Sequence, residues 1–236
     1  IKYKSINLIM QNILIENDYK SLKRDINEDL INVFIKNILV EDEKIINNNY
    51  FENIKINFKK NEIIQYLRKN EISYVEYIPN NFLTIIYENE NLTKNLFSRK
   101  NTYYNYLINN KEISEFYIIP NLDINDRYLL SPNELENNNL KKIIKFSEKY
   151  QNPNVVIIFS NKISNTFSYD IYLISNNKIL KVDSFNLDNN NYEFLFGKIK
   201  KSLINSWKFE NKIQNIKTQN LICEVNYFNL LELKQI

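Results

Sequence analysis

Five stretches of the chain carry apolar residues every three or four positions, which is the spacing that places them on one face of a helix. The predicted helices are residues 19–39, a short segment capped by Asn61, the region around 103–108, residues 131–150 and residues 190–209. The last helix has the longest apolar stripe, formed by Tyr192, Leu195, Phe196, Ile199, Leu203 and Trp207. The fourth helix is predicted to begin at Ser131, which suits an N-cap. Pro132 suits the first helical position, and Glu134 can complete a capping box with Ser131. The asparagines at 137–139 are expected to interrupt it.

Strands are predicted where apolar residues alternate with polar ones or run on for four to six positions. Residues 51–58 and 167–173 alternate, and 179–185 is expected to return as the hairpin partner of 167–173 through Asn176 and Asn177. Continuous apolar runs predict strands buried on both faces. These runs are 82–87, 116–119 and 154–159. Ile6–Ile15 and residues 220–228 are also interpreted as strands.

This order of elements predicts an α/β fold in which helices pack on a mixed β-sheet, with a mixed α+β arrangement as the alternative. Asparagine becomes more frequent near 90–112, where the strands pause. We therefore expect an α/β subdomain at 1–110 and a second at 111–228. Residues 229–236 are interpreted as the start of a further segment that the given sequence truncates.

The composition excludes most common catalytic chemistry. The chain has no histidine, so imidazole-based triads, dyads and metal sites are impossible. It has one glycine, Gly197, so the usual glycine-rich phosphate loops are absent. Its lone cysteine, Cys223, excludes an internal disulfide. The abundant asparagine, isoleucine and lysine are typical of an AT-rich genome. We expect a protein that is not an enzyme and that holds no cofactor and no metal.

The charge balance does not favour a nucleic-acid partner. The net charge is only +3, and arginine, the usual residue for bidentate base and phosphate contacts, occurs four times. Lysines at 198, 200, 201, 208 and 212 give the last helix a basic side, which we interpret as a solvated face opposite the core stripe. No apolar run is long enough to span a membrane.

The best candidate for a ligand or partner site is the loop that contains Pro120, Asp123, Asp126 and Arg127. It follows a predicted buried strand, the place where α/β sheets tend to bind ligands. Two carboxylates three residues apart could hold a hard cation or act as an acid and base. The alternative is that both aspartates cap local turns by accepting backbone N–H groups.

The order of these segments resembles the proteobacterial family called domain of unknown function 2066, whose members are exported proteins of the Gram-negative cell envelope. The most specific likeness is Ile118-Ile119-Pro120-Asn121-Leu122-Asp123-Ile124-Asn125-Asp126, followed by a helix ending in Lys149-Tyr150 and by Val155-Val156-Ile157-Ile158. The family usually has glycine before the first aspartate and after the tyrosine, where this chain has Leu122 and Gln151. Residues 120–207 are also similar to the amino-terminal domain of TolB, a noncatalytic envelope module.

The resemblance implies a periplasmic protein from which a signal peptide has been removed, and the first residue, Ile1, is consistent with a removed leader or a fragment. It implies no catalytic or ligand residue, because the family has none established. Our leading hypothesis is a non-enzymatic protein–protein interaction module in envelope assembly or maintenance. The alternatives are a metal-dependent hydrolase that uses Asp123 and Asp126, and a nucleic-acid-associated protein of an AT-rich virus or organelle.

Overall fold

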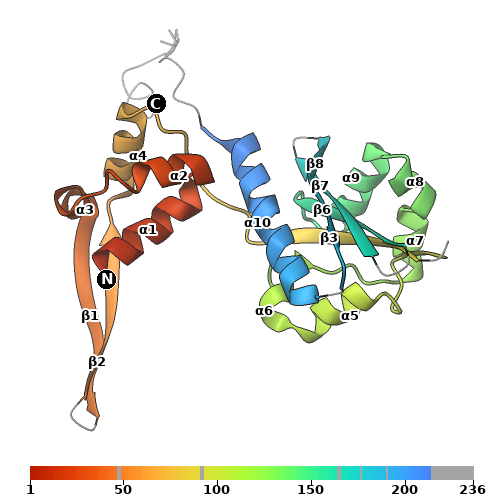
Figure 1. Ribbon diagram of the computed structural model, residues 1–236, viewed down its shortest axis with the longest axis horizontal. Coiled ribbons are helices and arrows are strands. Elements are labelled where there is room, and N and C mark those ends of the chain that lie inside the picture. Colours follow the sequence, from red (N-terminus) through yellow and green to blue (C-terminus); the bar gives the residue numbers. More distant parts are fainter. Residues whose placement is uncertain (47–48, 91–92, 164–165, 176, 190, 214–236) are drawn as a thin grey trace, which may run out of the picture.

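The structure is a computed structural model that describes residues 1–236 except 47–48, 91–92, 164–165, 176, 190 and 214–236. It has two lobes, each with its own hydrophobic core (Figure 1). The smaller lobe consists of α1 (Lys2–Ile13), α2 (Glu16–Leu22), α3 (Glu28–Phe34), β1 (Ile35–Ile46), β2 (Asn49–Phe58) and α4 (Lys60–Lys69). Its helices enclose Ile6, Met10, Leu14, Ile31, Phe34 and Leu67. The antiparallel β1–β2 hairpin extends away from them.

The larger lobe is built on a mixed sheet. Its strands are β3 (Phe82–Glu90), β4 (Thr93–Leu96), β5 (Tyr117–Ile118), β6 (Val155–Ile163), β7 (Thr166–Ser175) and β8 (Lys178–Leu187). They follow the order β4-β3-β6-β7-β8, and β5 also pairs with β3. β3 runs parallel to β5 and β6, whereas the other pairs are antiparallel. The predicted α/β class with a mixed sheet is confirmed.

Helices cover both faces of this sheet. They are α5 (Thr102–Asn109), α6 (Lys111–Ser114), α7 (Ile124–Leu129), α8 (Pro132–Glu136), α9 (Leu140–Lys149) and α10 (Tyr192–Asn211). Tyr103 of α5 contacts Tyr169 of β7 and Tyr192 of α10, so α5 and α10 share one face. On β3, the hydroxyl of Tyr87 donates to Glu136 of α8. The alternation of side chains along the strands places that contact on the opposite face.

Several elements match their predictions. Residues 82–87 are buried throughout and form most of β3, and β7 and β8 form the predicted hairpin. Ser131 and Glu134 make the predicted reciprocal capping box, and α8 and α9 are separated at 137–139 as expected. The strand predicted at 220–228 and the segment at 229–236 lie outside the described residues.

The strand predicted at Ile6–Ile15 is wrong, because most of that stretch belongs to helix α1. Ile6, Met10 and Leu14 are fully buried and lie four residues apart, which is a helical spacing. Leu8 between them is half exposed. Because exposed positions of this helix also carry apolar residues, the helical spacing of the buried ones could not be recognised in the sequence.

The single helix predicted for 19–39 is also wrong. Asn27 accepts a hydrogen bond from the Leu30 backbone at 2.9 Å and starts α3, and the chain turns into β1 at Ile35. Asn27 followed by Glu28 and Asp29 is a helix-start signal that could have located this break. The short helix after residue 59 is present, but it begins after Lys59 and is not capped by Asn61.

The two hydrophobic cores divide the chain earlier than the predicted boundary near 90–112. Tyr74 belongs to the small core and Val75 to the large one. β3, which falls within the predicted first subdomain, pairs with β6 in the middle of the large sheet. Parallel pairing brings together segments that are far apart in sequence, so the local composition cannot predict which strands pair.

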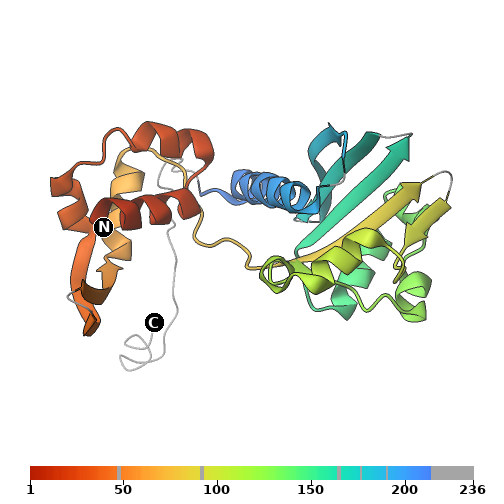
Figure 2. The ribbon, with the colours of Figure 1, turned by 60° about the horizontal axis from the view of Figure 1, so that its bottom comes forward.

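Helix α10 joins the two lobes (Figure 2). It packs on β7 and β8, and Trp207 near its end lies against Tyr77 in a tilted arrangement, with the ring centres 5.1 Å apart. Lys208 is buried, and its Nζ donates to the backbone oxygens of Gln11 and of Leu14, the second at 2.9 Å. The ammonium thus neutralises the carbonyl end of α1, where the helix dipole is negative.

Candidate functional site

The two aspartates of the loop at 120–127 are held by the chain's own donors. Asp123 is the N-cap of α7 and accepts the backbone N–H of Asp126 at 2.9 Å, which lowers the pKa of its carboxyl. Asp126 is fully buried and accepts the Leu122 N–H at 2.8 Å. Its other oxygen accepts Lys149 Nζ at 2.7 Å and the Tyr150 hydroxyl at 2.6 Å. Both carboxylates therefore perform the turn-capping role given above as the alternative reading of this loop.

The rest of this loop is fixed in the same way. Pro120 is buried, and the guanidinium of Arg127 donates through Nε to the Phe97 carbonyl at 3.2 Å. Leu122 has a φ of +58°, and Gln151, just after α9, has a φ of +51°. Such left-handed backbone favours glycine. Leu122 and Gln151 adopt this backbone conformation with a side chain in place of glycine.

Two large apolar side chains of this loop region are exposed to solvent beside Asn121, Asn125 and Arg127. Ile124 and Tyr128 lie four residues apart on α7, so they share one side of that helix. Their exposed fractions are 79% and 86%. Sequence reasoning selected the polar residues of the loop and missed these two, although their spacing was readable. A partner-contact role for the loop would therefore use Ile124 and Tyr128.

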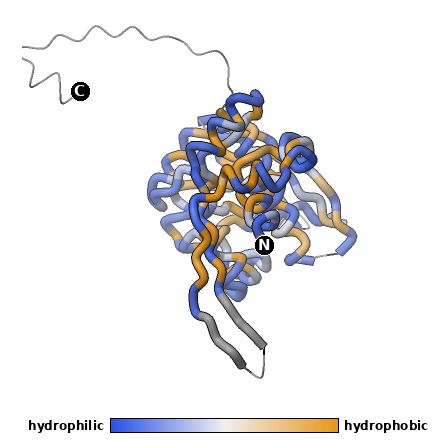
Figure 3. The backbone as a smooth tube through the Cα atoms, turned by 90° about the vertical axis from the view of Figure 1, so that its left-hand side faces the viewer, coloured by the Kyte–Doolittle hydropathy of each residue, from blue (hydrophilic) through white to orange (hydrophobic). Residues whose placement is uncertain are grey.

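The β1–β2 hairpin has one apolar face. Ile38 pairs with Ile56, and Val40 pairs with Ile54, so these four side chains lie on the same side of the ribbon. The neighbouring pair, Leu39 with Lys55, lies on the other side. Ile38 and Val40 are 42% and 47% exposed, in a two-stranded ribbon that projects from its lobe (Figure 3).

An apolar groove of about 440 Å³ continues this face at the base of the hairpin. Ile56 and Phe58 of β2 line one side of it. The opposite wall comes from α1 and α4, and its apolar residues are Ile9, Ile13, Ile63 and Ile64. Hairpin face and groove together form a continuous apolar surface on the small lobe, which we call the hairpin surface.

A polar cluster lies in the large core, between the sheet and α5. The Tyr103 hydroxyl is 2.7 Å from Ser160 Oγ and 3.1 Å from the Tyr169 hydroxyl. Burial raises the pKa of Tyr103, which keeps its hydroxyl neutral and hydrogen-bonded. Burial also raises the pKa of the nearby Glu88 carboxyl. Among the described residues, no basic side chain is hydrogen-bonded to Ser160. The hydroxyls of this cluster therefore satisfy one another as buried polar groups of the core.

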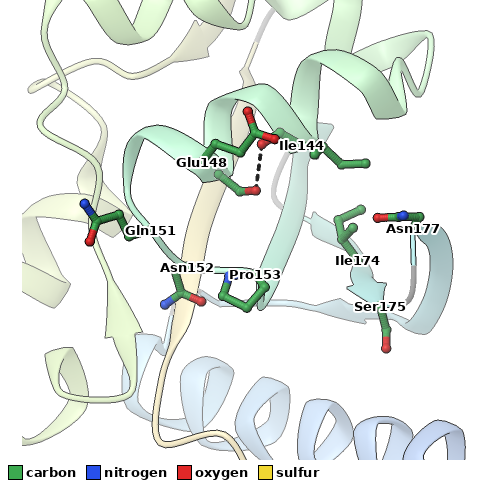
Figure 4. Close-up of a pocket in the computed structure, with 9 residues that line it drawn as sticks. Ile144, Glu148, Gln151, Asn152, Pro153, Ile174, Ser175 and Asn177 are labelled. Carbon is green, nitrogen blue, oxygen red and sulfur yellow. Dashed lines mark hydrogen bonds between the residues drawn. The ribbon is translucent and has the colours of Figure 1, made fainter.

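A surface hollow of about 680 Å³ lies between the end of α9 and the end of β7 (Figure 4). Among the described residues that line it, Glu148 is the one that carries a charge. Ser147 donates to the Ile144 carbonyl at 2.8 Å, and Asn152 is tied to Asn81. These two side chains are thus held by hydrogen bonds to a backbone carbonyl and to a residue outside the lining, and they do not converge on a ligand position.

Among the described residues, no three histidine, cysteine, aspartate or glutamate side chains gather as metal ligands would. The described helices include none with the length and apolar character needed to cross a bilayer. No protein-family model, curated protein or solved structure matches the chain.

Proposed function

We propose that this chain is a non-enzymatic module of the Gram-negative periplasm that acts by protein–protein contact in cell-envelope assembly or maintenance. The observation that carries the contact role is the hairpin surface. A projecting two-stranded ribbon with an apolar face leaves large aliphatic side chains in water, and such patches mark interaction sites. The occupant that we propose is an apolar segment of a partner protein that lies along the ribbon and ends in the groove.

The compartment in this proposal rests on the family resemblance. Two details support it: the positions of the family's glycines carry the left-handed backbone of Leu122 and Gln151, and the helix ending at Lys149 precedes a buried strand. The metal-dependent alternative has less support. A cation at Asp123 and Asp126 would have to displace the Lys149 ammonium and break the cap of α7.

Two adjacent residues provide a matched test of the contact role. Val40 and Leu39 have similar exposed fractions, 47% and 40%, but lie on opposite sides of the ribbon. A photo-crosslinking amino acid placed at Val40 in the native host should capture a defined protein, and the same residue at Leu39 should not. Val40→Asp should then abolish that product without lowering the melting temperature, because residue 40 is largely in water. Equal capture from both positions would contradict the proposal.

The compartment has its own test, which is a fusion of alkaline phosphatase to the end of this segment in the full-length product. The phosphatase is active only outside the cytoplasm, so an active fusion is expected. An inactive but intact fusion would discard the periplasmic proposal and favour the nucleic-acid alternative. A binding assay across salt would then be decisive, since phosphate contacts weaken steeply as salt rises.

A further inference from the structure

The only glycine of the chain occupies a position where nothing in the described structure needs it. Gly197 lies inside α10, where glycine costs about 1 kcal/mol relative to alanine because it loses more backbone freedom on folding. Its φ is not positive, and an added Cβ would meet no atom within 4 Å. Neither backbone conformation nor internal packing therefore accounts for the missing side chain.

Two surface grooves meet at this residue. One, of about 790 Å³, lies between α10 and the α5–α6 region and is walled by aromatic rings, including Tyr106, Phe116 and Phe196. The other, of about 510 Å³, lies between α10 and the α1–α2 region, with Leu14 and Ile204 in its lining. Gly197 and Lys200 line both grooves. Because Gly197 has no side chain, no side chain projects between the two grooves at this position.

The groove beside α1 and α2 carries excess positive charge. Lys20, Lys200, Lys201 and Lys208 line it, against the single carboxylate of Glu16. Lys20 and Lys201 share that carboxylate at 2.9 and 3.7 Å. Within the described residues, Lys200 has no ion-pair partner, and its ammonium lies 4.8 Å from the centre of the Phe116 ring. The groove beside α5 is balanced, because Lys111 and Lys200 face Glu112 and Glu193.

We propose that an acidic amphipathic segment of a partner protein crosses α10 at Gly197. Its carboxylates lie beside Lys20, Lys200 and Lys201, and its apolar side chains enter the aromatic groove. The absent Cβ lets the partner backbone approach the helix closely. This surface is separate from the hairpin surface. The proposal for α10 can therefore be tested independently of the function proposed above.

Substitutions at Gly197 separate binding from folding, because they should move the two in opposite directions. Gly197→Ala is expected to raise the melting temperature by about 2–4 °C, since alanine favours the helix and has free space. Gly197→Leu should leave the fold intact and fill the crossing point. Glu210→Leu, on the same helix but lining neither groove, is the matched control.

The probe is a displayed library of random peptides, selected on the full chain. We expect the recovered peptides to carry Asp or Glu next to aliphatic or aromatic residues, and to bind at least about tenfold more weakly to Gly197→Leu than to Glu210→Leu. Lys200→Glu should weaken binding, whereas Lys198→Glu should not, because Lys198 lies over the Phe185 ring and lines neither groove. Val40→Asp should bind normally.

The proposal is overturned by three results. These are a selection that yields no binder, peptides without acidic residues, and peptides that bind Gly197→Leu as well as the parent chain. Single-stranded DNA and phosphatidylglycerol vesicles are tested in parallel. If either binds in a Gly197-dependent way and the peptides do not, the surface recognises another anion and the acidic-peptide assignment is wrong.

Discussion

Asp126 and Lys208 are the two charged side chains buried within the described part of the chain, and each is surrounded by hydrogen-bonding partners. Removing such a partner leaves a buried group unsatisfied, which costs more than the bond itself contributes. Asp126 accepts from a backbone N–H, an ammonium and a phenol, so the conformation of its loop depends on one carboxylate. At the residue scale, Asp123 and Asp126 hold the backbone of this loop through hydrogen bonds.

Substituting the two aspartates by asparagine should distinguish their roles. Asp126→Asn is expected to lower the free energy of unfolding by about 2–3 kcal/mol, because charged hydrogen bonds inside the loop are lost. Asp123→Asn should change it by well under about 1 kcal/mol, because asparagine is an equally good N-cap. Urea unfolding measures both. Similar losses for the two variants would show that the burial of Asp126 has no energetic consequence.

Tyr150 should make stability depend on alkaline pH. Burial and its hydrogen bond to Asp126 raise the pKa of Tyr150 to about 12, above its ordinary value of 10.0. A group whose pKa is raised by folding stabilises the native state fully below its unfolded pKa, and this contribution is lost as pH rises through the folded pKa. The stability difference between the parent and Tyr150→Phe should be constant below about pH 10 and should shrink toward pH 12. A difference that grows with pH would contradict the raised pKa.

Gln151→Gly should stabilise the protein by up to about 1 kcal/mol. Gln151 is exposed and has a φ of +51° just beyond the end of α9, where a left-handed residue is usually glycine. Asn121→Gly is the control, because Asn121 is exposed without a positive φ and should lose stability from added freedom of the unfolded chain. Thermal unfolding compares them. A gain at both positions would point to a cause other than backbone strain.

At the scale of elements, the capping box at Ser131 fixes where one helix begins. Ser131 accepts the Glu134 N–H at 3.3 Å, and Glu134 accepts the Ser131 N–H at 2.8 Å. The two bonds define the start of α8, although that helix has only five residues. Glu134 also pairs with Lys142 of α9 at 3.0 Å, so the cap connects two consecutive helices.

Ser131→Ala should lower the free energy of unfolding by about 1 kcal/mol, the usual cost of losing an N-cap. Ser131→Thr keeps the oxygen and should recover most of this loss. Denaturant unfolding of the three proteins provides the comparison. Equal destabilisation by alanine and threonine would indicate that packing at this residue, rather than its hydrogen bonds, supports α8.

At the scale of the whole molecule, the lobes are connected by segment 70–81 and by α10. The end of α10 contacts the small lobe through Lys208 and through an antiparallel bridge between Tyr74 and Ile213. Trp207, which belongs to the large core, lies against Tyr77 of the connecting segment. Burial lowers the pKa of Lys208, so its ammonium is retained at a desolvation cost that the two carbonyls of the α1 end offset.

Lys208→Met should uncouple the lobes. Methionine keeps the apolar stem but leaves the carbonyls of Gln11 and Leu14 without their donor, at a cost of about 1–3 kcal/mol. Amide exchange in α1 and proteolysis within 70–81 should accelerate, whereas exchange in β3 should change little. Lys212→Met, near the same helix end, is the control, because Lys212 lies over the Phe209 ring. Faster exchange throughout both lobes would mean that they unfold as one unit.

The sequence by itself determined the α/β class, the capping box, the fully apolar strand β3 and the β7–β8 hairpin. Each of these depends on neighbouring residues, either through cap and turn residues or through the spacing of apolar residues along one segment. Of the candidate site, it located the loop from Pro120 to Arg127 and the possibility that its aspartates cap turns. Helix α1 escaped prediction because apolar residues such as Leu8 also occur on its exposed side.

Only the tertiary structure decided which segments meet. The pairing of β3 with β6, the burial of Lys208 against α1, the exposure of the apolar ribbon face and the two grooves at Gly197 all join residues distant in sequence. Burial depends on the surroundings and not on the residue type alone. Isoleucine residues are therefore buried in β3 and exposed on the hairpin. The sequence pattern therefore identified elements, and their packing decided which apolar and charged side chains form the surface of the protein.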